Sequence, residues 1–230
     1  MCVQSGSLHD RRQGLQPRAE RSTKADEAYR ILRRMIVTLE LAPGTVIDER
    51  YFASQFGIGR TPLREAVQRL AEQNLVVSSR HRQSQVAPVE LTDIQCICEL
   101  RLVLEPMAAS LACERADDED IQSVRTILDE YKKHVDAHDL KGALDVDYEF
   151  HDRLARSTRN PHLADAIDRL NAHSQRLWFL SFRQLRSLDG ILEEHDSVLQ
   201  ALAARRPAEA AQAMRNHIES FRERIRGLLL

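Results

Sequence analysis

The 230-residue sequence lacks any apolar run close to the roughly 20 residues that a membrane-spanning helix needs. Its first 23 residues are polar and contain no apolar stretch of the kind found in signal peptides. The four cysteines lack the paired spacing of zinc fingers, and three of them fall within one predicted helix. We therefore expect a cytoplasmic protein without a membrane anchor, whose cysteines are free thiols.

Glycine is scarce beyond residue 91, where long helical periods follow one another. Strand formers and turn residues concentrate instead between residues 40 and 90. This contrast predicts a mostly α protein with a disordered basic arm at 1–23, a small mixed domain at 24–90 and an all-helical domain at 91–230.

The net charge of −2 conceals a difference between the two halves. Residues 1–90 contain 14 Lys and Arg against 10 Asp and Glu, which leaves the acidic excess in residues 91–230. A basic N-terminal part joined to an acidic C-terminal part is typical of a nucleic-acid-binding domain attached to a domain with another task.

Three short helices are predicted in the N-terminal domain. Apolar residues recur at helical spacing from Lys24 until the Pro-Gly turn at 43–44. Asp48 is the predicted N-cap of a second helix, which the glycines at 57 and 59 end. In the third, RTPLREAVQRL at 60–70, we expect Thr61 as the cap and Pro62 in the first helical position.

The third helix has the composition of a helix that reads DNA. The outer face of this helix carries Arg60, Thr61 and Arg64 on or near it. Arginine can form bidentate hydrogen bonds with guanine edges or with phosphates. The apolar segments at 75–77 and 86–89 flank a polar loop that contains Arg80 and His81. This arrangement predicts a β-hairpin with a basic tip, the wing of a winged helix-turn-helix.

Residues 24–89 resemble the winged-helix domain of the GntR family. The matching residues are the Pro-Gly pair at 43–44, Glu49, the pair at 52–53, the segment 56–58, the motif RTPLREA at 60–66 and the pairs at 69–70 and 75–76. Two positions differ, because Gly59 replaces a usual serine and Gln83 stands where the wing often has glycine. The resemblance implies six DNA-binding residues: Arg50, Arg60, Thr61 and Arg64 in the helices, with Arg80 and His81 in the wing.

The C-terminal domain is predicted to be an antiparallel bundle of about six helices, at 92–114, 117–138, 140–158, 162–184, 187–205 and 207–228. Ligand-type side chains interrupt three of its apolar stripes. Asp147 and His151 share a face with leucines, and His195 and His217 do the same in the last two helices. Each histidine alone could be an ordinary core residue, but a buried carboxylate with three imidazoles suits a shared divalent metal.

Four segments of this domain resemble the FCD ligand-binding domain of the FadR subfamily: ELRLVLEPMAASLAC at 99–113, FHDRLARSTRNP at 150–161, EEHDSVLQAL at 193–202 and MRNHI at 214–218. The resemblance implies that Asp147, His151, His195 and His217 bind a metal. Such a ligand set suits Zn, Ni, Mn or Fe. Arg101 also faces the predicted core, either paired with Glu105 or another acid, or binding the carboxylate of an effector.

We therefore predict a transcription regulator rather than an enzyme. A homodimer would repress by binding a palindromic operator, and a small organic acid at the metal would change its DNA affinity. Two alternatives remain. The His-Asp pairs at 151–152 and 195–196 could belong to a metal-dependent phosphohydrolase, or the helical domain could be a metal-free structural dimeriser.

Overall fold

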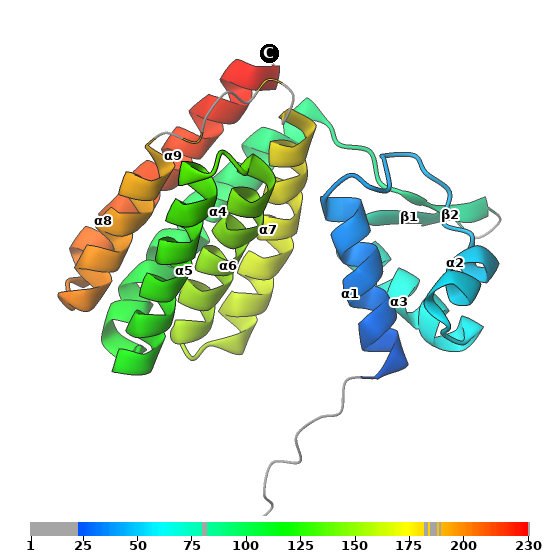
Figure 1. The fold of residues 1–230 in the computed structure, drawn as a ribbon, viewed down its shortest axis with the longest axis horizontal. Coiled ribbons are helices and arrows are strands. Elements are labelled where there is room, and N and C mark those ends of the chain that lie inside the picture. Colours follow the sequence, from blue (N-terminus) through cyan, green and yellow to red (C-terminus); the bar gives the residue numbers. More distant parts are fainter. Residues whose placement is uncertain (1–22, 80–81, 182–183, 185–187, 189, 230) are drawn as a thin grey trace, which may run out of the picture.

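The computed structural model describes residues 23–79, 82–181, 184, 188 and 190–229. Within these ranges a winged helix-turn-helix precedes a bundle of six helices, as predicted (Figure 1). The elements are α1 Lys24–Val37, α2 Glu49–Phe56, α3 Arg60–Glu72, β1 Val76–Ser79, β2 Arg82–Val86, α4 Leu91–Arg115, α5 Asp118–Asp136, α6 Leu140–Ser157, α7 Pro161–Ser181, α8 Ile191–Ala203 and α9 Pro207–Leu229. None of the helices in these ranges has the length and hydropathy of a transmembrane span.

The N-terminal part folds around one apolar core. Leu32 of α1 and Leu63 and Leu70 of α3 are completely buried in it. Thr23 caps α1 through a capping box, and it is the one residue of the predicted arm, 1–23, that lies within the described residues. Asp48 caps α2 as predicted, since its carboxylate accepts the backbone N–H groups of residues 50 and 51.

The start of α3 differs from the prediction. The helix begins at Arg60, so Thr61 is not its cap and Pro62 is not its first residue. Gly59 occupies the N-cap position with an extended backbone and offers no side-chain hydrogen bond. Because the carbonyl of Gly59 already accepts the N–H of Leu63, the first turn closes two residues earlier than a cap at Thr61 would allow.

The wing is a two-stranded antiparallel sheet whose strands extend into the loop predicted at 78–85. Val76 pairs with Val86, and Val77 pairs with Gln85. An exposed hairpin buries little side-chain surface, so polar residues can continue its backbone ladder. Arg80 and His81 lie outside the described residues.

The described part of the bundle contains two large apolar cores and a smaller apolar cluster of α4, α6 and α7 around Ile167. One large core includes Leu154, Leu202 and Met214, and the other includes Leu144, Trp178 and Phe221. Helices α4, α6, α8 and α9 contribute to both cores. α8 begins at Ile191, later than predicted, after Gly190 in a left-handed N-cap conformation (φ 80°).

The N-terminal part packs against the bundle through α1 and α7, which lie side by side in Figure 1. Arg33 of α1 donates to Asp168 of α7 at 2.8 Å and to the hydroxyl of Tyr148 of α6 at 3.3 Å. Ala172 of α7 is buried within the N-terminal core. The two parts are therefore joined by specific contacts as well as by the chain at 87–90.

Candidate metal centre and DNA-binding surface

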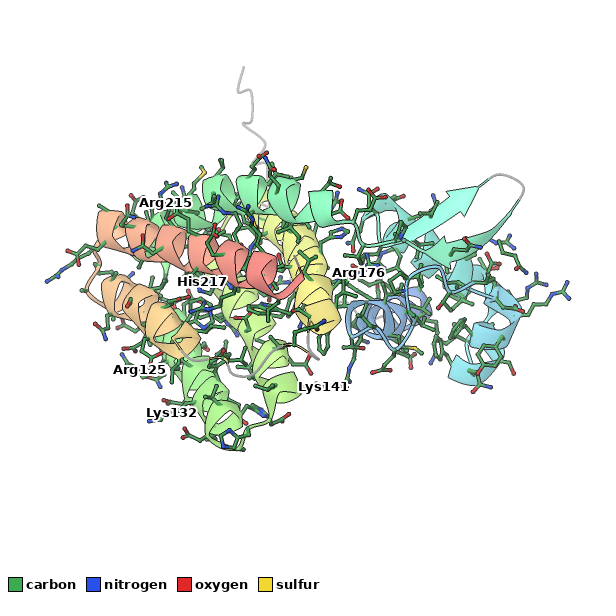
Figure 2. The ribbon with its side chains drawn as sticks, turned by 90° about the horizontal axis from the view of Figure 1, so that it is seen from above. Arg125, Lys132, Lys141, Arg176, Arg215 and His217 are labelled. Atoms are coloured by element: carbon green, nitrogen blue, oxygen red, sulfur yellow. The ribbon has the colours of Figure 1, made fainter. Side chains whose placement is uncertain are left out.

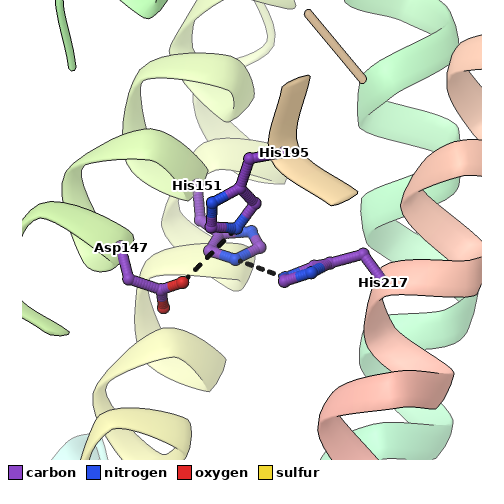
Figure 3. A group of neighbouring side chains, drawn as sticks. All are labelled: Asp147, His151, His195 and His217. Atoms are coloured by element: carbon purple, nitrogen blue, oxygen red, sulfur yellow. Dashed lines mark hydrogen bonds and ion pairs between the residues drawn. The ribbon is translucent and has the colours of Figure 1, made fainter. Parts of the chain in front are cut away.

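The structure brings together four residues that the sequence predicts as metal ligands. Asp147 and His151 come from α6, His195 from α8 and His217 from α9 (Figure 3). One potential ligand atom from each lies within 4.8 Å of all the others, and all four side chains are buried. The group sits between the two apolar cores of the bundle, where nearby residues of the same helices belong to one core or the other.

Two carboxylates lie beside the Nδ1 atoms of two imidazoles, on the side of each ring that faces away from the centre. Glu194 Oε2 lies 2.9 Å from His217 Nδ1 in a hydrogen bond, and Glu105 Oε2 lies 2.6 Å from His151 Nδ1 without hydrogen-bond alignment. A carboxylate at Nδ1 favours the tautomer with its proton on that nitrogen, so the Nε2 lone pair faces the centre. The two Nε2 atoms are 3.2 Å apart (Figure 3). If both rings carry their protons on Nδ1, two lone pairs face each other at this distance, and a cation between them would remove their repulsion.

The surroundings of these groups favour neutral imidazoles and charged carboxylates. Burial lowers the pKa of His217, and burial with the neighbouring His217 and His151 keeps the pKa of His195 far below its usual value. Burial opposes the ionisation of Glu194, but hydrogen bonds from His217, Arg224 and Ser220 lower its pKa to about 2. Neutral imidazole and ionised carboxylate are the forms that bind metal ions.

His195 supplies the most direct sign of a missing partner. Its side chain is fully buried, yet neither ring nitrogen has a hydrogen-bond partner among the described residues. Its Nε2 lies 3.3 Å from Asp147 Oδ1 without hydrogen-bond alignment. Leaving a buried polar atom unsatisfied costs about 1–3 kcal/mol, so a ligand for this nitrogen is expected.

The four residues fit a divalent transition metal. Ligand atoms about 2.1 Å from one ion lie roughly 3–4 Å apart, and the separations of 3.2 and 3.3 Å fall in this range. Three imidazole nitrogens and a carboxylate oxygen suit Zn, Ni, Mn or Fe.

Arg101 lies beside this centre and is fully buried on α4. Its Nε donates to Glu105, its Nη1 donates to Ser174 Oγ at 3.1 Å, and its Nη2 is 3.4 Å from His151 Nε2. Arg101 therefore forms the ion pair with Glu105 that the sequence left open, and it also approaches the ligand atoms. The charge of Arg101, with the nearby ring of His151, overcomes the effect of burial and holds the pKa of Glu105 well below its usual range.

The DNA-binding residues predicted in the helices gather at the neighbouring starts of α2 and α3. Arg50, Arg60, Thr61 and Arg64 are all exposed. The Arg64 guanidinium, 66% exposed, donates to Glu49 Oε2 at 3.1 Å, which holds its side chain beside the first turn of α2. The first turns of the two helices thus present Arg50, Arg60 and Arg64 together with the acidic side chains of Asp48 and Glu49.

Sequence reasoning missed Glu194 and Ser174 as parts of the centre. Glu194 directly precedes His195 but contacts His217 on another helix. Ser174 reaches Arg101 across 73 positions of the chain. Neither contact leaves a periodic signal, whereas Glu105 could be found because it follows Arg101 by one helical turn.

Comparison with known proteins agrees with this architecture. Residues 24–86 match the family described as "Bacterial regulatory proteins, gntR family", and residues 96–220 match the "FCD domain". The chain belongs to the GntR family of transcriptional regulators and carries an FCD domain. Its relatives in this family include the Nta operon transcriptional regulator of Aminobacter aminovorans, 30% identical over 83% of this chain and 89% of that protein.

Two further proteins resemble most of the chain. The HTH-type transcriptional repressor RspR of Escherichia coli K12 is 26% identical over 87% of this chain and 88% of that protein. The solved structure of E. coli McbR/YncC superposes with a TM-score of 0.81 at 20% identity, covering 89% of this chain and 98% of that one. This structural likeness shows a shared fold.

Family membership decides against the phosphohydrolase alternative, because GntR-family regulators are not enzymes. The side chains agree. Asp152 and Asp196, the aspartates of the two His-Asp pairs, contact Arg156 and Gln200 rather than the centre.

Proposed function

We propose that this GntR-family protein is a repressor whose operator affinity depends on a divalent metal and a small carboxylate in the bundle. The orphaned nitrogens of His195 carry the metal part of the proposal, because a fully buried imidazole without a partner is costly. When bound, the metal would supply a fixed positive charge and open coordination positions for an anion. Repression is favoured by the relative RspR, which is described as a repressor.

The charges around the centre favour an anionic effector. Glu105 pairs with Arg101 and Glu194 pairs with Arg224, whereas Asp147 lies beside His195, which leaves one negative charge in excess. A divalent cation reverses this balance to one positive charge. Because an isolated buried charge is costly, a monoanion such as a carboxylate would complete the site.

Arg101 is the protein group that we assign to the effector. It reaches within 3.4 Å of a ligand nitrogen, and its planar guanidinium matches the geometry of a carboxylate. A carboxylate on the metal would compete with Glu105 for this guanidinium. The effector would thereby change contacts inside the bundle, as regulation requires.

For DNA binding we assign Arg50, Arg60 and Arg64 to bases or phosphates and Thr61 to phosphate. Arg80 and His81 of the wing are assigned to the minor groove. Within the chain, we propose a DNA-binding domain at 24–90, an effector domain at 91–230 and a basic arm at 1–23. Binding to chromosomal DNA also implies a cytoplasmic protein.

An exposed apolar stripe on α4 supports a homodimer. Leu100, Val103 and Met107 lie on one face of this helix and are 53%, 65% and 51% exposed. A bundle helix that is apolar on its outer side as well calls for a partner there. A second copy packed on this stripe would give the two-fold symmetry with which paired winged helices read a palindromic operator.

The metal proposal is tested by elemental analysis of purified protein and by operator binding with and without the ion. Operators can be selected from a random duplex pool. Asp147→Asn is expected to lose the metal and its effect on DNA affinity, while Asp152→Asn, one turn along α6, retains both. Wild-type protein that purifies without metal and is not stabilised by Zn²⁺ would instead support the metal-free dimeriser.

A further inference from the structure

Four successive side chains of α7 contact four different parts of the molecule. His173 Nε2 donates to the carbonyl oxygen of Gln73 at 2.9 Å, and Gln73 is the C-cap of α3. Ser174 Oγ accepts from Arg101 at 3.1 Å. The next two residues donate to the backbone: Gln175 to Leu144 in α6, and Arg176 to Ala87 in the connection between β2 and α4.

The contacts toward the DNA-binding part are firmly held. Arg176 is 1% exposed and lies at the junction between bundle and winged helix (Figure 2). Burial lowers the pKa of Arg176 to about 10, while the charge of Asp93 opposes this effect, so the side chain is charged at neutral pH. A buried cation depends strongly on its few partners, here the carbonyl of Ala87. Gln73 is held a second time, because the hydroxyl of Tyr29 on α1 donates to its side chain.

The contact toward the metal centre is direct as well. Arg101 uses one guanidinium nitrogen for Ser174 and another for the approach to His151. Any ligand that turns this guanidinium toward the metal must lengthen or break its bond with Ser174. Ser174 and His173 are neighbours on one rigid helix, so a shift at one displaces the other.

We propose that this turn of α7, His173 to Arg176, couples the metal centre to the C-terminal end of the recognition helix α3. The proposal rests on the proposed function and adds the element that joins its two sites. Occupation of the centre moves Arg101, Ser174 follows, and the bond from His173 to Gln73 tightens or loosens. A ligand can shift an equilibrium only through contacts that differ between the two states, and these contacts join both sites.

Hydrogen exchange of full-length protein tests the coupling without a known effector or operator, using Zn²⁺ alone as the probe. The reporters are the backbone amides of residues 70–75, where Leu75 N–H bonds to the carbonyl of Leu70. In the wild type we expect Zn²⁺ to change their exchange rates about fivefold, the lower end of typical allosteric coupling. Ser174→Ala and His173→Ala should each reduce this change to less than twofold.

Ser181→Ala is the matched control. Ser181 is also buried on α7, but its hydroxyl donates only to Trp178 of the same helix, so this variant should respond like the wild type. The Zn²⁺ affinity of Ser174→Ala should stay within about threefold of the wild type, since Ser174 touches none of the four ligands. A fivefold response that persists in Ser174→Ala refutes the coupling, and so does a wild type that binds Zn²⁺ without any response at 70–75.

A second experiment separates failure of the proposed coupling from failure of the proposed metal site. Arg101→Lys keeps the charge but loses the planar fork that reaches Ser174 and Glu105 together. In metal-free protein it should alter exchange at 70–75, and it should have no further effect when combined with Ser174→Ala. If Zn²⁺ fails to bind, the proposed metal site is wrong. The Arg101→Lys experiment in metal-free protein then decides by itself whether α7 transmits changes at Arg101.

Discussion

Replacing Glu194 by glutamine tests the metal centre without replacing any of the four proposed metal ligands. Glu194 accepts a hydrogen bond from His217 Nδ1 at 2.9 Å and pairs with Arg224 at 2.7 Å. Glutamine has nearly the same size but no charge, so it can no longer increase the basicity of the His217 ring. Loss of such an outer carboxylate typically weakens metal binding 10–100-fold.

The expected size of the effect follows from linkage. At a free metal concentration 100 times the Kd, binding stabilises the folded wild type by about 2.7 kcal/mol. A 10–100-fold weaker Kd reduces this gain to roughly 1.4–0.4 kcal/mol at the same concentration. For a chain of this length, each kcal/mol shifts the Tm by about 2–4 °C, so the metal-induced rise should fall from about 5–11 °C to about 1–6 °C.

Thermal melts with and without metal, together with competition against a chromophoric chelator, measure both quantities. Glu193→Gln is the control, because Glu193 is the adjacent residue of α8 and is exposed. This substitution removes the same charge as Glu194→Gln. Comparing each variant with its own metal-free form eliminates the effect of leaving Arg224 without its partner. Equal metal affinity in the two variants would refute the assigned role of Glu194.

Three further predictions concern the other parts of the proposal. Arg60→Ala and Arg64→Ala should each weaken duplex binding and lower the magnitude of the slope of log affinity against log salt concentration by about 0.9, as measured by fluorescence anisotropy. An unchanged slope would exclude a phosphate contact by the replaced arginine. In metal-free protein the unfolding free energy should fall as the pH drops below about 6.5. The unfolded chain then takes up a proton at His195 that the folded protein, in which the pKa of His195 is lowered, does not bind. Urea unfolding from pH 5 to 8 should therefore show a weaker pH dependence of the unfolding free energy in His195→Gln than in the wild type. Val103→Glu on the α4 stripe should produce monomers in light scattering, whereas Thr126→Glu on α5 should leave dimers intact.

The helices and the ligand set could be predicted because both depend on local spacing. His195 and His217 replace apolar residues on the inner faces of their helices, and a buried polar position in such a stripe is visible without a structure. The starts of two helices were predicted to within one residue where a proline begins them, at Pro161 and Pro207.

What the sequence could not predict depends on tertiary contacts or on backbone geometry. The contact of Glu194 with His217 requires the register of α8 against α9, which no periodicity encodes. The early start of α3 depends on the extended backbone of Gly59, a residue with no side chain to mark the cap. The strand lengths of the wing follow from pairing across the hairpin rather than from apolar alternation.

The polar layer between the two apolar cores also restricts how the helices can slide. Apolar side chains tolerate a shift of one turn, about 5.4 Å, with modest repacking. The same shift would pull Glu105 of α4 away from His151 of α6, and it would pull Glu194 of α8 away from His217 and Arg224 of α9. The second separation would leave the carboxylate of Glu194 without its partners inside the bundle. Ionisable residues in the interior thus determine the vertical alignment of α4, α6, α8 and α9, even before any ion is bound.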